Sequence, residues 1–213
     1  MDDEPDQRGE SRASRRATKT RQRLLDAALY VFNHKGVEGC SIEDITESAD
    51  VGKGTFYRHF MDKLDILKTL LDGATNDLIK RMPPEQSPAV SLDDRTTQLM
   101  TAHMTFFSER EDLFLVFLQG QTMVATRPAA LPGIQPPYAR YMAEMEKRVA
   151  PAMPTASTPA QIRRIAYTIA AAACGTVTVG LFMLNSKHDV MNNLDVTRQS
   201  LLVGAPQLLR CAG

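Results

Sequence analysis

Residues 41–60, SIEDITESADVGKGTFYRHF, constrain the fold of this chain most, because two short helical patterns flank a tight break at residues 50–52. Ser41 can accept a hydrogen bond from the amide near Asp44 and so cap the first of these helices. Residues at i, i+3 and i+7 predict one apolar face on that helix: Ile42, Ile45 and Ala49. The segment therefore predicts a helix-turn-helix.

The second pattern predicts a helix with one side packed in the core and the other side exposed. Phe56 and Phe60 are four residues apart, so both can pack against the first helix. The side chains expected to point away from this core are Lys53, Thr55, Tyr57, Arg58 and His59. A helix over residues 53–60 would be about 12 Å long, which suits a DNA major groove about 12 Å wide. We therefore expect double-stranded DNA as the partner.

The stretch from about Thr20 to Leu70 resembles the DNA-binding domain of the TetR family of bacterial transcription regulators. The resemblance rests on these features, in the family's order and spacing: TRQRLLDAALYVF, Gly36, Ser41, EDITESA, GKGTFYRHF and Lys63. Two positions depart from the family pattern. Asp50 stands where a glycine is common, and Gly52 stands where a serine often opens the recognition helix, so one possible DNA contact is absent.

The resemblance implies roles for individual residues of this segment. Lys53, Thr55 and Arg58 are expected to approach base edges, and Gly54 belongs to the same recognition motif. Phosphate contacts are expected from Ser41, Tyr57, His59 and Lys63. Each of these could instead be only a helix cap or a surface group, and Ser41 can serve as both cap and phosphate ligand.

Charge is segregated along the N-terminal region. The chain has 25 basic and 25 acidic residues, a balance that by itself argues against a nucleic-acid-binding protein. Residues 12–23, however, contain six basic and no acidic residues. We expect a disordered charged arm over residues 1–17, and we expect Arg15, Arg16 and Lys19 to bind phosphates or a minor groove. The alternative is a solvated tail that aids solubility.

The remaining periodicity predicts an all-α fold with no β-strands. The first helix ends at Gly36, and a fourth begins near Asp62 and ends before Pro83. Further helices are expected near residues 92–110, 112–126, 137–150, 159–185 and 194–205, the last stopped by Pro206. We expect a three-helix DNA-binding domain over residues 18–64 and a helical ligand-binding and dimerisation domain over residues 65–213.

One predicted helix raises the question of a membrane span, because residues 165–184 contain no charged residue. Small residues dominate this run, so we expect a helix buried in a soluble dimer rather than in a membrane. Cys40, Cys174 and Cys211 form no CxxC pair, and the histidines lack ligand spacing. We therefore expect a cytoplasmic protein without a metal or cofactor.

The resemblance implies that the last two helices pair with those of a second subunit in a four-helix bundle. A narrow stripe supports this homodimer: Ile162, Ala166, Ile169, Ala173, Thr176 and Gly180, joined by Leu201 and Leu202. The alternative is an ordinary core within one subunit.

The resemblance also implies a small-molecule pocket in the C-terminal domain. Its candidates are methionine, aromatic and adjacent polar residues: Met100, His103, Met104, Phe107, Phe114, Phe117, Gln121, Tyr138, Tyr141, Met142 and Met145. The alternative is plain core. No charged side chain is evident inside the helical stripes, so we expect an effector that is not multiply charged.

Together these features predict a homodimeric repressor that a small, largely apolar ligand releases from its DNA operator. The alternatives are a helical adaptor that binds protein and a regulator that acts without a small-molecule effector. Residues 52–55, GKGT, lack the spacing of a phosphate-binding loop, and we find no nucleophile–base set. We therefore expect a protein that is not an enzyme.

Overall fold

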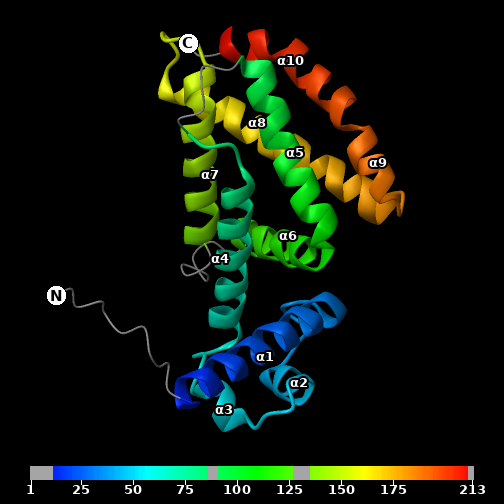
Figure 1. Cartoon of the computed structure of the whole chain (residues 1–213). Coiled ribbons are helices and arrows are strands. Elements are labelled where there is room, and N and C mark those ends of the chain that lie inside the picture. The colour runs from blue at the N-terminus through cyan, green and yellow to red at the C-terminus, as the bar shows by residue number, and fades with distance from the viewer. Residues whose placement is uncertain (1–11, 86–90, 127–134, 211–213) are drawn as a thin grey trace, which may run out of the picture. The chain divides into compact units, whose positions relative to one another are not determined.

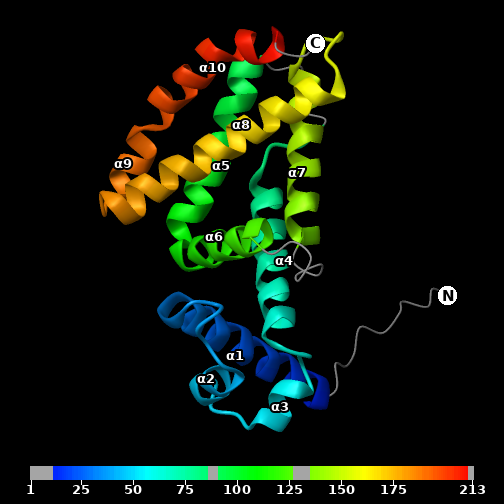
Figure 2. The ribbon, with the colours of Figure 1, turned by 180° about the vertical axis from the view of Figure 1, so that it is seen from behind.

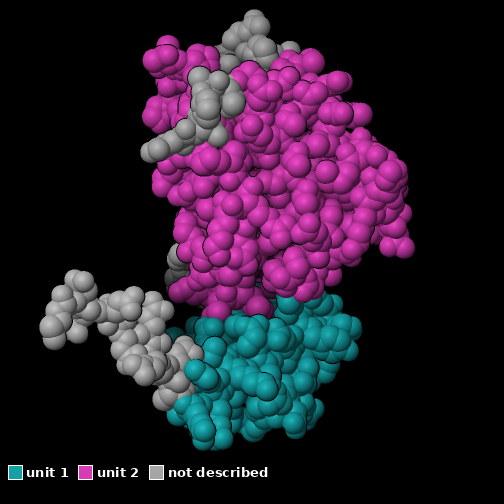
Figure 3. Space-filling view, in the orientation of Figure 1, with its two compact units in different colours: residues 1–67 teal, residues 68–213 magenta. Residues whose placement is uncertain are grey.

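The computed structural model describes residues 12–85, 91–126 and 135–210, and within these ranges every regular element is a helix (Figures 1 and 2). The chain divides into two compact units, residues 1–67 and residues 68–213 (Figure 3). This division falls within helix α4 (Lys63–Arg81). The predicted all-α class is confirmed.

Unit 1 contains α1 (Arg12–Lys35), α2 (Ile42–Ser48), α3 (Lys53–Tyr57) and the first residues of α4. Helix α2 contacts both α1 and α3. Large apolar side chains from all three helices fill the core, including Leu24, Phe32, Ile45, Phe56 and Phe60. Truncating a buried phenylalanine in such a core typically costs about 3–5 kcal/mol, so a few side chains can fix the helix arrangement.

Two predicted helix boundaries, the end of α1 and the start of α2, are confirmed. Gly36, just after α1, has a φ of 74°, which is the left-handed conformation that glycine adopts without a steric penalty. At the start of α2, the amide of Asp44 donates to Ser41 Oγ over 3.1 Å. The Ser41 amide donates in return to Asp44 Oδ2 over 2.9 Å, which completes a capping box.

Two predictions in unit 1 are wrong. Helix α1 begins at Arg12, so residues 12–17 are helical rather than disordered, whereas residues 1–11 lie outside the described ranges. Helix α3 has five residues, and is about 7.5 Å long at 1.5 Å per residue. The amides of His59 and Phe60 both donate to the Phe56 carbonyl, each over 2.9 Å. The chain therefore tightens into a turn that returns Phe60 to the core.

Unit 2 contains the rest of α4 and a helical assembly around α5 (Leu92–Glu109), which packs against α8 (Pro159–Thr178) (Figures 1 and 2). The other elements are α6 (Glu111–Thr126), α7 (Gln135–Val149), η2 (Ala150–Ala152), η3 (Val179–Met183), α9 (Lys187–Asn192) and α10 (Leu194–Arg210). Helix α5 also contacts α6, α7, α9 and α10. Its central place explains why so many of its side chains are buried.

The C-terminal end differs from the sequence prediction in two places. Helix α10 continues through Pro206 to Arg210, because a proline removes one backbone donor without always ending a helix. Helix α9 lies where only a break was expected, and Ser186 caps it by accepting from the Asp189 amide over 3.2 Å. A Cβ atom at Gly180 would collide with Val190 of α9, so glycine is required there.

Among the described residues, one helix, Pro159–Met183, is long and apolar enough to cross a membrane by length and composition alone. It packs against α5, α7 and α10, and less than half of its most apolar window is buried. One face of this helix thus belongs to the core of unit 2, as in many soluble proteins.

Candidate functional site

The surface of α3 has the exposed chemistry that the sequence predicts. Lys53, Tyr57 and Arg58 are exposed, whereas Thr55 and His59 are half-buried. Beneath them Phe56 and Phe60 are buried, with ring centroids 5.9 Å apart. The edge of the Tyr57 ring also packs on Phe56, with ring centroids 5.5 Å apart. The aromatic core thus fixes a short helix whose outer side presents two cations and a phenol.

Both cations of this surface have partners within unit 1. The Lys53 ammonium forms an ion pair with Glu43, and Arg58 Nη2 donates to Thr55 Oγ1 over 2.9 Å. The Lys53–Glu43 pair is half exposed. Exposed pairs contribute about 0–1 kcal/mol, so a phosphate or base could replace Glu43 at small cost. The Arg58–Thr55 contact places two predicted base-contacting residues side by side.

Lys63 contacts the backbone directly before Ser41 and so has a structural role that the sequence did not predict. Its ammonium donates to the carbonyl oxygens of Glu38 and Cys40, over 3.0 and 2.9 Å. These bonds fix the residue directly before Ser41. Two of the three Lys63 donors are therefore used internally.

The turn between α2 and α3 explains the departure at position 50. Asp50 has a φ of 50°, a left-handed conformation that aspartate adopts more readily than most residues but less readily than glycine. Arg23 Nη2 supports the turn by donating to the carbonyl oxygens of Ala49, over 2.6 Å, and Asp50, over 3.2 Å.

The basic run of α1 contains arginines that contact the rest of unit 1 and others that are exposed. Arg23 holds the turn, and the Arg21 guanidinium lies over the Phe60 ring at 4.8 Å from its centroid. The predicted DNA-binding residues Arg15, Arg16 and Lys19 are exposed on α1. With Arg12 they follow i, i+3, i+4, i+7 spacing, so they form one basic face, which helical spacing could have revealed.

The N-terminal helices and their capped turn match a known family. Residues 24–70 fit the model of the bacterial regulatory proteins of the tetR family. The chain belongs to the TetR family. This is a family of helix-turn-helix transcriptional regulators and not of enzymes.

Relatives of this TetR-family protein match it over different lengths. The regulator SrpR of Pseudomonas putida is 38% identical over 69 residues, which is 32% of each chain. The repressor KstR of Rhodococcus jostii is 27% identical over 197 residues, covering 91% of this chain and 88% of KstR. For SrpR and two other relatives, the match spans only 25% to 52% of their length.

A solved structure shares the fold over most of the chain. FadR of Bacillus subtilis, in complex with stearoyl-CoA, superposes with a TM-score of 0.68 at 20% identity. The superposition covers 86% of this chain and 98% of the FadR chain. At this identity the likeness shows the fold of the TetR-family protein and not its ligand.

The predicted pocket residues of unit 2 form packed core. Eight of them are buried: Met100, His103, Met104, Phe107, Phe114, Phe117, Tyr141 and Met145. Tyr138 and Met142 are half-buried, and Gln121 is exposed on α6 and does not join them. None of the eleven lines the small apolar cavity between α5, α8 and α10 or the open groove beside Arg81 and Thr97. The aromatic rings contact one another instead, as Phe107 does with Phe114 and Phe117 at centroid distances of 4.6 and 5.3 Å.

The polar groups of this core satisfy each other. His103 Nδ1 lies 2.6 Å from the Leu99 carbonyl oxygen and therefore carries a proton that it donates. His103 Nε2 then accepts from the Tyr141 hydroxyl, also over 2.6 Å. Burial lowers the pKa of His103 to about 4, and burial raises the pKa of Tyr141. Tyr138 donates to the Phe117 carbonyl oxygen over 2.7 Å. The neutral His103–Tyr141 pair is thus a core hydrogen-bond network.

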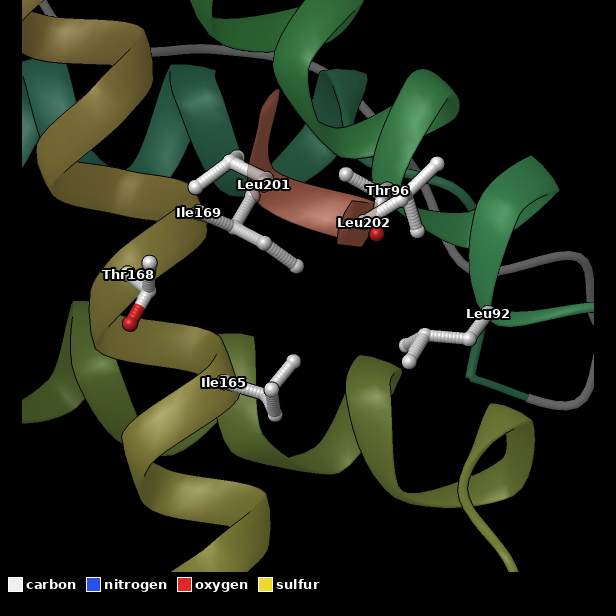
Figure 4. A pocket seen from close by; sticks show the side chains of 7 residues that line it. All are labelled: Leu92, Thr96, Ile165, Thr168, Ile169, Leu201 and Leu202. Carbon is white, nitrogen blue, oxygen red and sulfur yellow. The ribbon is translucent and has the colours of Figure 1, made fainter. Parts of the chain in front are cut away.

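A small apolar cavity lies elsewhere, between α5, α8 and α10 (Figure 4). It is partly open and has a volume of only about 10 Å³, and its lining is Leu92, Thr96, Ile165, Thr168, Ile169, Leu201 and Leu202. The hydroxyl of Thr168 donates to the Arg164 carbonyl oxygen over 2.8 Å, so the lining is almost entirely hydrocarbon. Leu201 and Leu202, predicted at a dimer interface, face this cavity.

The expectation that no charged side chain lies inside the helical stripes is wrong. Arg95 is 0% exposed and Arg148 is 9% exposed. The signal was present in the sequence, because Arg95 occupies the same helical face as Leu92 and Leu99, three residues after one and four before the other.

The predicted dimer stripe on α8 lies inside the protomer. Ala166, Ile169, Ala173 and Gly180 are buried, and Thr176 Oγ1 lies 3.2 Å from Thr197 Oγ1 of α10 in the same chain. Ile162 is half-buried. The sequence alternative, an intramolecular core, therefore describes this stripe. The small residues allow α8 to approach α5 and α10 closely.

The opposite face of α8 is exposed and apolar. Tyr167 is 48% exposed and Val179 at the start of η3 is 44% exposed, with Ala171 and Gly175 exposed between them at four-residue spacing. Val196 and Val203 of α10 are 62% and 80% exposed. Within the ranges that the structure describes, no group of three or more metal-ligating side chains comes together.

Proposed function

We propose that this TetR-family protein is a homodimeric DNA-binding repressor, released from its operator by a small, largely apolar ligand. The observation that supports this most is the surface of α3, where exposed Lys53, Tyr57 and Arg58 stand over the buried Phe56 and Phe60. A short rigid helix with outward cations suits contact with base edges in a major groove. The name of KstR, a transcriptional repressor, supports the direction of regulation.

The residues around α3 divide between base readout and positioning. Lys53, Thr55 and Arg58 would read bases, whereas Ser41, Tyr57 and His59 would hold phosphates. Lys63 would use its remaining donor for a phosphate, because its other two fix the backbone before Ser41. The basic face of α1, with Arg15, Arg16 and Lys19, would follow the phosphate backbone.

Homodimerisation would use the exposed face of α8 and α10 rather than the buried stripe. A second copy would cover Tyr167, Ala171, Gly175 and Val179 together with Val203. A contiguous exposed apolar surface of this kind favours association, and a two-fold pair of α3 helices would read two half-sites about 34–36 Å apart or at a multiple of that spacing.

The ligand would enter unit 2 through the apolar cavity between α5, α8 and α10. With about 10 Å³ this cavity has room for about one water, so it would have to widen around the ligand. Its hydrocarbon lining suits an apolar chain, and the FadR structure with stearoyl-CoA is a neighbour of the same fold. Ligand binding would change the affinity for operator by a coupling free energy of about 1–3 kcal/mol. We place the protein in the cytoplasm, where its DNA partner lies.

The test is selection of genomic fragments by the purified protein, followed by titration of the selected fragment with candidate apolar ligands. We expect a fragment with two related half-sites and weaker binding once a ligand saturates the protein. A regulator that needs no effector would keep its DNA affinity with every ligand that binds. A helical adaptor would select no fragment at all.

A further inference from the structure

Arg95 is a buried cation without an anionic partner among the residues of unit 2 that the structure describes. Its side chain is fully buried, yet Nε and Nη2 have no hydrogen-bond partner. The remaining nitrogen, Nη1, makes one long contact of 3.4 Å with the Pro84 carbonyl oxygen. Burying an unpaired charge is costly, so buried guanidinium groups are normally paired with an anion. The unsatisfied donors of Arg95 therefore require an explanation.

A second buried arginine, Arg148, adds positive charge near Arg95. Arg148 of α7 donates from Nε to the Pro83 carbonyl oxygen over 3.1 Å, next to the carbonyl that Arg95 contacts. Burial, and then the charge of Arg148, lower the pKa of Arg95. Arg148 is neutralised by Glu144, whose Oε2 lies 2.5 Å from Nη1. Arg95 has no such carboxylate.

Apart from the exposed Glu85, the nearby acids are engaged elsewhere. Glu144 accepts from Lys147 as well as Arg148. In the first turn of α5, Asp93 pairs with Arg198 of α10, and Asp94 accepts from the Ser91 hydroxyl over 2.6 Å. Two positive charges thus meet one negative charge at the Arg95–Arg148 pair.

The geometry of the unused donors indicates what would fit. Nε and Nη2 lie on one edge of the planar guanidinium, and their two N–H groups point in parallel. Such an edge binds two oxygens of one carboxylate or phosphate in a bidentate pair. The apolar cavity is lined by Leu92 and Thr96, which belong to the same turn of α5 as Arg95.

We infer that Arg95, supported by Arg148, binds an oxyanion group of the effector, a carboxylate or a phosphate, while the apolar part of the same molecule enters by widening the small cavity that the neighbouring residues Leu92 and Thr96 line. This inference rests on the proposed ligand-responsive function and narrows the effector to an amphiphilic acid. The sequence predicted a largely apolar effector that is not multiply charged. Arg95 adds that this effector has one anionic group.

The experiment compares dodecanoate, dodecyl phosphate and uncharged dodecanol by titration calorimetry against the full-length protein. We expect the wild type to bind one of the two anions at least about tenfold more tightly than dodecanol, and the stronger of the two identifies the group as carboxylate or phosphate. Arg95→Met should bind all three within about threefold of one another. The matched control is Arg140→Met, which removes an exposed arginine of α7 that binds Asp72 and should keep the preference.

Thermal unfolding separates this role from a structural one. Because Arg95→Met removes a buried charge without a counter-ion, the variant should unfold at the same or a higher temperature than the ligand-free wild type. A marked loss of stability would show that Arg95 is structural and would overturn the proposal. A wild type without preference for either anion, or an Arg95→Met variant that keeps the preference, would also overturn it.

Two further measurements test whether Glu85 is an internal counter-ion of Arg95 and whether Arg95→Met affects DNA binding. Glu85→Gln removes an exposed carboxylate next to Pro84 in sequence, and an anion preference that appeared only in this variant would show that Glu85 is the internal counter-ion, which contradicts the proposal. Operator binding of Arg95→Met without ligand should equal that of the wild type. If the anion preference is observed but no variant binds DNA, the proposed function fails while the anion site stands.

Discussion

Acidification should destabilise unit 2 through one buried side chain, His103. Its ring is fully buried between α5 and α7, where Nδ1 donates to the Leu99 carbonyl oxygen and Nε2 accepts from the Tyr141 hydroxyl. Its pKa lies near 4, lowered chiefly by burial, whereas an unfolded histidine has a pKa of about 6.5. As the pH falls below about 6.5 the unfolded chain therefore binds a proton that the folded chain does not.

The size of the effect follows from these two pKa values. The free energy of unfolding should fall by about 1.4 kcal/mol for each pH unit below about 6.5. The loss from this group should reach about 2 kcal/mol at pH 5 and about 3 kcal/mol at pH 4, below which the folded histidine is also protonated. Above about pH 6.5 His103 is mostly neutral in both the folded and the unfolded state, so it causes little loss of stability there.

Urea unfolding followed by circular dichroism between pH 7 and pH 5 measures this loss. The control is His103→Gln, which keeps an acceptor for the Tyr141 hydroxyl but does not titrate, so its stability should depend on pH less steeply by about 1.4 kcal/mol per unit. Equal slopes for the two proteins would refute the reasoning. So would an NMR titration in which the His103 ring becomes protonated near pH 6.5 in the folded state.

Two further predictions concern the turn of unit 1 and the exposed face of unit 2. Because Asp50 has a φ of 50°, Asp50→Val should destabilise unit 1 by about 1–2 kcal/mol whereas Asp50→Gly should not; equal urea midpoints for the two variants would contradict this. Because Val203 is 80% exposed on the face proposed for dimerisation, Val203→Glu should sediment as a monomer. Tyr30→Glu, at an exposed site of unit 1, should remain dimeric; a dimeric Val203→Glu would exclude this face.

The sequence predicted the helix-turn-helix well because its signals are local. The Ser41 cap, the left-handed Gly36 and the buried Phe56 and Phe60 each depend on neighbours within a few residues. The length of α3 was overestimated, because the shared Phe56 carbonyl that ends the helix leaves no mark on apolar periodicity. Lys63 appeared to be a surface cation because its partners, Glu38 and Cys40, lie more than twenty residues earlier in the chain.

Unit 2 was harder to predict because α8 has two apolar faces. Periodicity identified Ala166, Ile169 and Ala173 as a packing stripe but could not decide whether the partner was the same chain or a second copy. The structure places them against the same chain and leaves the face of Tyr167 exposed. Gln121 was grouped with the core residues by proximity in sequence, although it lies on the outer side of α6.

The burial of Arg95 was also missed, although its position between Leu92 and Leu99 on one helical face was a signal. Because arginine is nearly always at the surface, no charged side chain was expected inside the helical stripes. Only the tertiary arrangement, which places Arg95 and Arg148 at adjacent carbonyls of residues 83–84, reveals the unpaired guanidinium. Such local conflicts between sequence pattern and environment often mark functional sites.

If the outer face of α3 reads DNA sequence, as proposed, its cations should matter for the selected fragment and not for scrambled DNA of the same length. Lys53→Ala and Arg58→Ala should each lower affinity for the selected fragment by about 1–3 kcal/mol, while affinity for scrambled DNA changes little. Lys80→Ala, which removes an exposed cation of unit 2, should leave both affinities unchanged. If Lys53→Ala and Arg58→Ala bind the selected fragment as tightly as the wild type, α3 does not read the operator.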